Sequence, residues 1–427
     1  PCLSIIPRDA IATTVLLGEA VLLVPAQLPD DGQRLTELAT GLGVSLEEFN
    51  RKMTRAEDRN FVYLRRHAKP QAADAILSLG IAGIYGEKEY HRFYPGGEVA
   101  AHVVGFTNID DVGQEGLELS FDDWLKSFKK IALENDISEQ TFNKSMLNVK
   151  YLPNVIKYDR FQPEFYEDTV TYISKRTSNK KLTSGLALYK KNYQLIDEVE
   201  KKFSVEKELL LSLMGIETNF GTYVGKMDIL SSLATLSFDK RRSAFFTNEL
   251  ITILQLVEKE VIDHDILFGS WAGAYGNFQF MPTSIEKYAI DYDLNSKIEL
   301  KKIEDSFASA ANYMNKMNWK KNEPCFIKVN LKENIPKKYL NSSAKKINNK
   351  KKLRSFKKYF IEFNHLDIDP NLIVGIITPD KDIVPSALTY KPAYIVFENY
   401  ELILKWNRSL RFALAVCTLK ESFKNEI

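Results

Sequence analysis

Long segments with helical periodicity dominate the chain after Phe121. Apolar residues recur there every three or four positions, the pattern of an amphipathic α-helix with one buried face. The segments are FDDWLKSFKKIALEN (121–135), SGLALYKKNYQLIDEVEKKF (184–203), KELLLSLMGIET (207–218), SAFFTNELITILQLVEKEVI (243–262) and ELILKWNRSLRFALAVCTLKESF (401–423). Strand-like pieces, CFIKVNL, LIVGIIT and AYIVF, lie between residues 322 and 400. We therefore expect a mainly helical domain over 121–427 with a small mixed subdomain at about 322–400.

Residues 1–120 differ from the rest in charge and in pattern. They hold 11 basic and 17 acidic residues, a net charge of −6, while the whole chain carries +2. Near-helical spacing predicts a helix over 26–60, FVYLRRHA predicts a strand, and PQAADAILSLG predicts a helix that ends at Gly80. We expect an α+β segment here, and the change in residue usage near 120 indicates two segments of different origin.

Composition argues against several classes of protein. The small net charge gives no global field for nucleic acid, and the lysine clusters lack the interleaved aromatics of nucleic-acid-binding surfaces. The apolar stretch 11–25 is too short to span a bilayer, and we expect no secretory or lipoprotein signal in this sequence. Cys2, Cys325 and Cys417 are odd in number and far apart, so we expect buried thiols rather than a disulfide framework or a metal cluster.

One acidic residue occupies an unusual position in a helical segment. Glu217 follows Leu210 and Met214 by seven and three positions, which puts it on the apolar stripe. Burial raises the pKa of a carboxyl group, and a raised pKa suits a general acid. Position alone leaves two alternatives open: a glutamate that reaches solvent at the helix end, or one held by a structural arginine.

Two motifs follow Glu217 along the chain. Arg241 and Arg242 are adjacent, and GSWAGAYGNFQFMPTS (269–284) is rich in small residues before it turns at Pro282. The second motif is not a phosphate loop, because no Lys-Ser/Thr follows its last glycine. Small residues allow a bulky polymer to approach the backbone, and Gln279 offers an amide donor and acceptor.

Taken together, the motifs resemble the membrane-bound lytic transglycosylase B type, glycoside hydrolase family 103. The resemblance covers about 300 residues. Its blocks are DRFQPEF (159–165), GIETNFG (215–221), LATLSFDKRRSAFF (233–246), GSWAGAYGNFQFMPTS (269–284), ASAANYMNKMNW (308–319) and ILKWNRSLRFALAV (403–416).

The resemblance implies a lysozyme-like fold and a peptidoglycan glycan strand as substrate. Glu217 would protonate the bond between N-acetylmuramic acid and N-acetylglucosamine and then act as base, leaving a 1,6-anhydro end, with no cofactor required. Most glycosidases use two carboxylates, whereas this family lacks the second one. Asp228 and Asp239 are the nearby acids, and we interpret both as structural.

The resemblance also implies a set of residues that bind substrate. Trp406 stands where some members have tyrosine, which puts a hydrogen bond from a phenol in question. The implied cleft residues are Arg241, Arg242, Ser270, Gln279, Tyr313, Trp406 and Asn407.

A calcium loop is a weaker prediction. Asp291, Asp293 and Asn295 alternate like the first ligands of such a loop, but positions six and twelve lack the usual glycine and glutamate. Some members of the family have a lengthened loop, which would make Asp305 the last ligand. The alternative is a simple polar turn.

Residues 1–120 resemble the pedestal, or dimerisation, region of division-type class B penicillin-binding proteins. The similar blocks lie at 61–66, 90–107 and 113–118, and the pedestal of that family is non-catalytic. The transpeptidase motifs that should follow are absent as a set. SFDDWL (120–125) fits the end of the pedestal and also the start of the transglycosylase, so we interpret the chain as a chimera.

These resemblances imply a periplasmic enzyme of a Gram-negative bacterium, with division or cell-wall synthesis proteins as partners of the first segment. Two alternatives remain: a muramidase that uses water at the same bond, and a non-catalytic scaffold that only grips glycan. The Lys/Asn-rich stretch 345–358 is predicted to be a solvated surface insertion.

Overall fold

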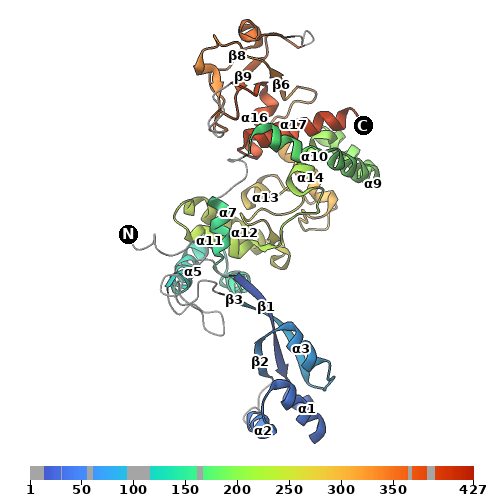
Figure 1. Ribbon diagram of the computed structural model, residues 1–427, viewed down its shortest axis with the longest axis vertical. Helices are drawn as coiled ribbons and strands as arrows, with labels where there is room; N and C mark the ends of the chain where they lie inside the picture. Colours follow the sequence, from blue (N-terminus) through green and yellow to red (C-terminus); the bar gives the residue numbers. More distant parts are fainter. Residues whose placement is uncertain are drawn as a thin grey trace. The chain divides into compact units, whose positions relative to one another are not determined.

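The structure is a computed structural model that describes residues 14–29, 31–54, 61–93, 116–160, 167–363, 368–381 and 390–427. Its contacts divide the chain into two compact units, Pro1–Lys126 and Ser127–Ile427 (Figure 1). The boundary predicted at residue 120 lies inside α5 (Gly116–Glu134), just before this division. Most of the block DRFQPEF lies outside the described residues.

The described residues of the first unit form a three-stranded antiparallel sheet, with helices α1 to α3 packed against it. The strand order is β2-β1-β3, where β1 is Thr14–Leu23, β2 is Val62–Ala68 and β3 is Ile84–Phe93. The helices are α1 (Gly32–Leu42), α2 (Leu46–Thr54) and α3 (Pro70–Leu77). Val21, Leu38, Phe49 and Ile76 belong to the core between sheet and helices, so the α+β prediction holds for this segment.

The single helix predicted over 26–60 is wrong. Gly43 takes a left-handed conformation with φ +72° and ends α1, and α2 starts three residues later. The glycine has no Cβ to oppose this conformation, which makes it a common residue after a helix end. The leucine spacing runs through the break because both helices bury their apolar faces in one core.

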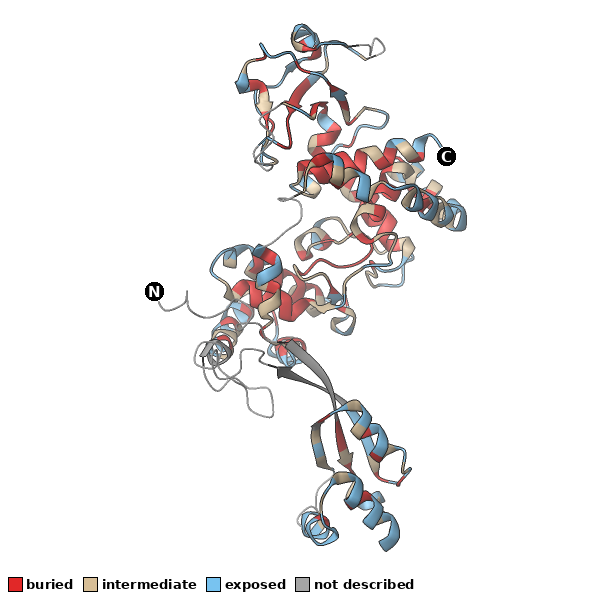
Figure 2. Ribbon diagram, viewed as in Figure 1, coloured by how far each residue is buried: buried red, intermediate tan, exposed pale blue. Residues whose placement is uncertain are grey.

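Helices build most of the second unit. Their bounds are α6 Glu139–Met146, α7 Pro153–Arg160, α8 Thr169–Arg176, α9 Asn179–Phe203, α10 Lys207–Thr218, α11 Ile229–Phe238, α12 Ser243–Glu258, α13 Pro282–Tyr288, α14 Ile303–Lys316, α16 Glu398–Trp406 and α17 Leu410–Lys424. Nearly every residue of α11 and most of α10 and α17 is buried (Figure 2). A helix that is apolar all round belongs at the centre of a domain, and α10 packs there against α17.

The predicted helix over 401–423 is in fact two helices. The break falls at Asn407–Ser409, and the side chain of Ser409 accepts a hydrogen bond from the backbone N–H of Phe412 to cap α17.

No helix among the described residues has both the length and the apolar character that crossing a bilayer requires.

A small mixed subdomain lies between α14 and α16, as predicted. Its sheet has the order β6-β10-β9-β7, with β8 paired to β9. The bounds are β6 Phe326–Val329, β7 Leu340–Asn341, β8 Lys351–Lys352, α15 Leu353–Phe356, β9 Ile373–Ile377 and β10 Ala393–Val396, and a two-stranded ribbon elsewhere pairs β4 Met227–Asp228 with β5 Phe268–Gly269.

The Lys/Asn-rich stretch 345–358 is part of this fold and not the solvated insertion that was predicted. Ile347, Leu353 and Phe356 are at most 2% exposed, and the last two belong to the subdomain's core. The stretch supplies β8 and α15 while its lysines point to solvent. Three apolar residues spaced within a basic run therefore anchor it to the sheet.

The prediction of unpaired thiols is wrong for two cysteines. Cys325, next to β6, forms a disulfide with Cys417 in α17 across a Cα–Cα distance of 6.1 Å. The bond ties the mixed subdomain to the helix that packs on α10. The two residues are 92 positions apart, so only the folded topology brings them together.

Candidate active site

The end of α10 sets the position of Glu217. Asn219, Phe220 and Gly221 have positive φ values of 50°, 58° and 80°, which turn the chain sharply after the helix. Buried Thr218 holds this turn: its hydroxyl donates to the Asn277 carbonyl at 2.7 Å and accepts from the Gly221 N–H at 3.0 Å. Thr218 is thus fixed in the interior while Glu217, its neighbour, is half-buried.

Glu217 lines a cavity of about 410 Å³. The other side of the cavity comes from the end of α8 and the first turns of α9 and includes Lys175, Lys180 and Lys181. Lys181 donates to the Gly215 carbonyl at 2.5 Å, and burial lowers the pKa of this lysine. A cation at the last carbonyls of a helix interacts favourably with the helix dipole, so Lys181 steadies the turn that carries Glu217.

An aromatic wall meets Glu217 on another side. The indole N–H of Trp406 donates to the Glu217 carboxylate at 3.0 Å. Trp406 stacks on Tyr313 with ring centroids 4.8 Å apart, and Tyr313 stacks on Tyr288 at 4.1 Å. Burial raises the pKa of Tyr313 to about 12, so its phenol keeps its proton at neutral pH. Some members of the family that this chain resembles have tyrosine at position 406. Here the indole N–H of Trp406 is the hydrogen-bond donor in place of a phenol.

Gln279 lies in sequence between Phe278 and Phe280, whose rings pack against the aromatic wall. Phe280 contacts both Tyr313 and Trp406, and Phe278 contacts Trp406. Gln279 itself has φ +51°, uncommon for a residue with a side chain. Its side-chain N–H groups donate to the carbonyls of Val224 (3.2 Å) and Gly276 (2.8 Å), so its carbonyl oxygen is the group left to accept a hydrogen bond.

Close backbone contact shapes the loop before Gln279. A Cβ on Gly225, which has φ +85°, would lie 2.0 Å from the Gly269 carbonyl oxygen. The Ser270 hydroxyl accepts hydrogen bonds from the N–H groups of Ala272 (3.3 Å) and Ala274 (3.0 Å). Ser270 therefore holds the small-residue loop in shape beside the chain that leaves α10.

Arg241 and Arg242 share one buried carboxylate. Both guanidinium groups form ion pairs with Asp159, whose side chain is 1% exposed, while the arginines are nearly half exposed. Arg242 also lies over the rings of Phe245 and Phe246, each at 4.7 Å. Asp159 thus holds both arginines in place, while nearly half of each arginine side chain remains exposed.

The remaining residues of interest occupy helix ends. Asn407 is half-buried at the end of α16, directly after Trp406. Asp228 accepts a hydrogen bond from the Ser231 N–H and caps α11, and burial raises its pKa. Asp239 pairs with Arg160 at 3.0 Å. Asp228 thus caps α11, and Asp239 links the end of α11 to the end of α7.

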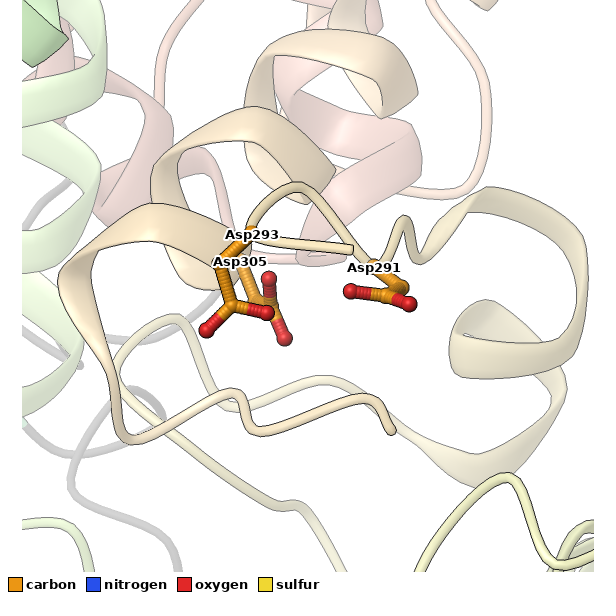
Figure 3. A group of neighbouring side chains, drawn as sticks. All are labelled: Asp291, Asp293 and Asp305. Carbon is orange, nitrogen blue, oxygen red and sulfur yellow. The ribbon is translucent and has the colours of Figure 1, made fainter. Parts of the chain in front are cut away.

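The predicted calcium loop gathers three carboxylates. Oxygen atoms of Asp291, Asp293 and Asp305 lie within 4.8 Å of one another, and Figure 3 shows these side chains turned toward one space. Asp305 is fully buried, and burial raises its pKa. The Asn295 side chain instead donates its amide N–H groups to Asp293 (2.9 Å) and Glu299 (2.8 Å). Glu299 is a nearby carboxylate that was not predicted.

The donor set suits a hard cation. Carboxylate and amide oxygens are the ligands that calcium prefers, and mutual repulsion of close carboxylates is relieved by a shared cation. Backbone N–H groups of Tyr292 and Glu299 already donate to Asp305 at 2.8 Å, which fixes its orientation. The residues therefore fit a calcium ion.

Comparison with known proteins decides the family. The family described as "Transglycosylase SLT domain" matches residues 120–421. The chain belongs to this family.

Relatives and solved structures agree with this membership of the SLT family. "Membrane-bound lytic murein transglycosylase B" of Escherichia coli is 34% identical over 148 residues, 34% of this chain and 41% of that protein. The crystal structure of SltB3 from Pseudomonas aeruginosa in complex with NAG-anhNAM-pentapeptide has 29% identity and a TM-score of 0.63, covering 71% of this chain and 79% of SltB3. The fold is therefore lysozyme-like, mainly helical and α+β, as predicted.

Two further similarities concern the first segment and the fold of the second unit. "Peptidoglycan D,D-transpeptidase FtsI" of E. coli is 43% identical over 94 residues, 22% of this chain but 16% of that protein, and supports the chimera. The structure of E. coli Slt35 in complex with calcium shares the fold at 22% identity and a TM-score of 0.58, over 71% of this chain and 93% of Slt35. The aligned parts span 41% of the E. coli transglycosylase B and 16% of FtsI, less than half of each relative.

Sequence reasoning missed several buried polar residues that fix helices of the second unit. Thr218 and Asn277 are buried partners that hold the end of α10, and Glu249 accepts hydrogen bonds from the N–H and hydroxyl of Thr283 at the start of α13. For Glu249 a signal was available in the sequence, because it is a charged residue among the apolar residues of α12. Lys181 gave no such signal, because its partner lies on another helix.

Proposed function

We propose that the chain is a lytic transglycosylase that cleaves the β-1,4 bond between N-acetylmuramic acid and N-acetylglucosamine in peptidoglycan. The observation that carries the proposal is the hydrogen bond from Trp406 to Glu217, at a cavity in a chain of the SLT family. A single glutamate beside an aromatic wall suits an acid–base reaction on a sugar polymer, because aromatic faces stack on sugar rings.

Glu217 acts twice in this proposal. Its acid form donates a proton to the glycosidic oxygen, and the bond from that oxygen to C1 of the muramic acid breaks. The C6 hydroxyl oxygen of the same sugar then bonds to C1, and the Glu217 carboxylate takes the hydroxyl proton. The products are a free 4-hydroxyl on N-acetylglucosamine and a 1,6-anhydromuramic end, and Glu217 is protonated again.

The surrounding residues position the substrate in this proposal. Trp406 orients the carboxyl group through its N–H, and Tyr313 and Gln279 lie beside it on the same wall. Ser270 and Asn407 come from the small-residue loop and the end of α16. Arg241 and Arg242 offer exposed guanidinium edges that suit carboxylate or hydroxyl groups of the glycan.

The test is a digest of purified peptidoglycan by the wild type and by Glu217→Gln, with products read by mass spectrometry. We expect anhydro-muropeptides from the wild type and a loss of at least about a hundredfold in the variant, the range of general acid–base catalysis. Products heavier by one water would instead indicate a muramidase. Binding without products from either protein would indicate a scaffold.

We propose that Asp291, Asp293 and Asp305 hold a calcium ion that stabilises the loop, with Glu299 beside them. The Slt35 structure in complex with calcium supports this assignment at the level of the fold. Calcium would have a structural role, since the residues lie on a loop and a helix start apart from Glu217 in sequence.

We propose a periplasmic location. The Cys325–Cys417 disulfide supports it, because disulfides persist in oxidising compartments such as the periplasm. The similarity to part of a division transpeptidase supports a non-catalytic role for the first segment, with cell-wall synthesis or division proteins as its partners.

A further inference from the structure

One stretch of the mixed subdomain concentrates positive charge. Residues 325–360 contain twelve basic residues and one acid, a net charge of +11, so the rest of the chain carries a net −9. Lysine-rich usage alone does not produce this imbalance, because basic and acidic residues nearly cancel over the other residues after 120. The excess is therefore local to residues 325–360, since the whole subdomain (322–400) carries 14 basic and 8 acidic residues, a net +6.

All twelve basic side chains are exposed. We name them the basic face: Lys328, Lys332, Lys337, Lys338, Lys345, Lys346, Lys350, Lys351, Lys352, Arg354, Lys357 and Lys358. Among the described residues, only Lys350 of this set has an acidic partner, Glu401 at 2.6 Å. The other cations form no ion pair with a carboxylate in the described part of the chain, and their mutual repulsion costs stability unless an anionic partner is present.

Aromatic rings lie among these lysines, which corrects the expectation that the lysine clusters lack interleaved aromatics. Lys338 and Lys351 lie over the ring of Tyr339 at 5.5 and 5.1 Å, and Lys358 lies over Tyr359 at 5.0 Å. A hydrogen bond from Lys351, with the charges of the neighbouring lysines, lowers the pKa of the Tyr339 phenol. The local potential is therefore strongly positive.

The basic face is connected to the candidate active site through α16. Lys350 pairs with Glu401 on that helix, and Trp406, which donates to Glu217, lies at the end of the same helix. The mixed subdomain and α16 belong to one compact unit (Figure 1). α16 has nine residues and so spans about 13 Å, which sets the length that a polymer bound at Glu217 must cover to reach Lys350.

We propose that the basic face binds the carboxylates of the peptides that branch from peptidoglycan glycan strands. This inference rests on the proposed function, since it assigns a second contact to the same substrate. The cations are spread over β6, two loops, β8, α15 and two short 3-10 helices rather than gathered in a pocket, which fits repeated single charges along a polymer. Compact, mobile lysine ammonium groups suit such contacts, because they do not require the fixed geometry of a guanidinium.

The test measures binding to intact sacculi by co-sedimentation, with Glu217→Gln present in every protein to prevent digestion. The test variant carries Lys337→Gln, Lys345→Gln, Lys346→Gln and Lys357→Gln, four exposed side chains without an acidic partner among the described residues. The matched control carries Lys190→Gln, Lys191→Gln, Lys201→Gln and Lys259→Gln, which removes the same charge from exposed helix positions elsewhere.

We expect the test variant to bind sacculi about tenfold more weakly, about 1.4 kcal/mol, while the control stays within about twofold of the parent protein. High salt should erase the difference, because exposed charges are screened. Peptide-free glycan strands, which an amidase releases from sacculi in soluble form, should bind the test variant and the parent equally when binding is measured in solution.

Several results would overturn the proposal. Equal losses in test and control variants would show a net-charge effect, and undiminished binding of the parent to peptide-free glycan would remove the peptides as the ligand. Tighter binding of the parent to vesicles of anionic phospholipid than to sacculi would assign the face to a membrane.

Failure of the proposed function is separable from failure of this inference. Proteins with Glu217 intact are given peptide-free glycan strands, on which the four-lysine variant should release anhydro ends at the wild-type rate. A wild type that releases none refutes the enzymatic proposal, and the sedimentation result still decides the basic face.

Discussion

At the residue scale, the hydrogen bond from Trp406 to Glu217 is the contact that most directly affects the proposed chemistry. Trp406→Phe keeps a ring that can stack on Tyr313 but removes the N–H that reaches the carboxylate at 3.0 Å. A hydrogen bond to a charged group contributes roughly 1.5–3 kcal/mol. We therefore expect kcat for release of anhydro-muropeptides to fall about tenfold or more, measured from initial rates.

Trp406→Tyr is the control for this prediction, because it restores a donor on an aromatic ring. Its rate should exceed that of Trp406→Phe, and both variants should give the circular dichroism spectrum of the wild type. A Trp406→Phe enzyme with the wild-type rate at saturating substrate would show that the indole N–H has no part in orienting Glu217.

Individual residues of the site differed in how far they could be predicted. Glu217 was conspicuous as a carboxylate in an apolar helix, and Gln279 lay in a motif of small residues, so local sequence was sufficient to single them out. Lys181 contacts Gly215 from another helix, 34 positions away, and nothing near it in sequence indicates that contact. Contacts between helices depend on packing, which the local pattern does not specify.

At the scale of elements, the crossing of two chain segments at Gly225 shapes the loop that carries Ser270 and Gln279. Gly225→Ala adds a Cβ 2.0 Å from the Gly269 carbonyl oxygen and also strains a residue at φ +85°. Such a clash and such a conformation each cost on the order of 1–3 kcal/mol. We expect the free energy of unfolding of the second unit to fall by at least about 2 kcal/mol in urea titrations.

Lys190→Ala provides the comparison for this substitution within the same unit. Lys190 is exposed on α9, so alanine there removes no buried contact. Alanine there should leave stability unchanged or slightly raised, because alanine is the better helix former. Equal effects of the two alanine substitutions would contradict the crossing as the cause.

The acidic loop gives a prediction that depends on pH. Burial raises the pKa of Asp305, so without metal this carboxyl group favours folding at low pH, and the benefit is lost as pH rises through its folded pKa. Calcium reverses the sign, because it binds the deprotonated carboxylates. The increase in melting temperature on adding CaCl2 should therefore be large at pH 7 and shrink as pH falls toward the raised pKa of Asp305.

Asp305→Asn should abolish most of this increase in melting temperature, and MgCl2 should produce a smaller one, because magnesium demands stricter geometry and gives up water reluctantly. An increase that is equal at all pH values, or equal in the variant, would mean that the ion binds elsewhere.

The elements themselves were predicted better than their ends. Periodicity located the helices and the strand pieces, but it continued through Gly43 and through Asn407–Ser409, where the chain breaks between helices. Residues on both sides of each break bury apolar side chains in a common core, so the spacing of apolar residues carries no trace of the break. Glycine and the Ser409 cap were the available signals.

At the scale of the whole molecule, sequence composition pointed to two segments, whereas the covalent link within the second one was not foreseen. The Cys325–Cys417 disulfide closes a loop of 92 residues that contains the entire mixed subdomain. A spacing of this length gives no framework pattern, because pairing depends on where β6 and α17 meet in the fold. The same length is what makes the bond matter energetically.

Loop closure in the unfolded chain predicts how much the disulfide stabilises the second unit. A cross-link over about 100 residues removes unfolded-state entropy worth up to about 4.7 kcal/mol, and measured values are typically 2–4 kcal/mol. Cys417→Ser should therefore lower the free energy of unfolding by about 2–4 kcal/mol in urea. The Cys325→Ser, Cys417→Ser double variant should match either single variant, since each change breaks the same bond. A reductant should destabilise the wild type by a similar amount and leave the stability of the double variant unchanged. If the reductant destabilises both proteins alike, the stabilisation does not come from this disulfide.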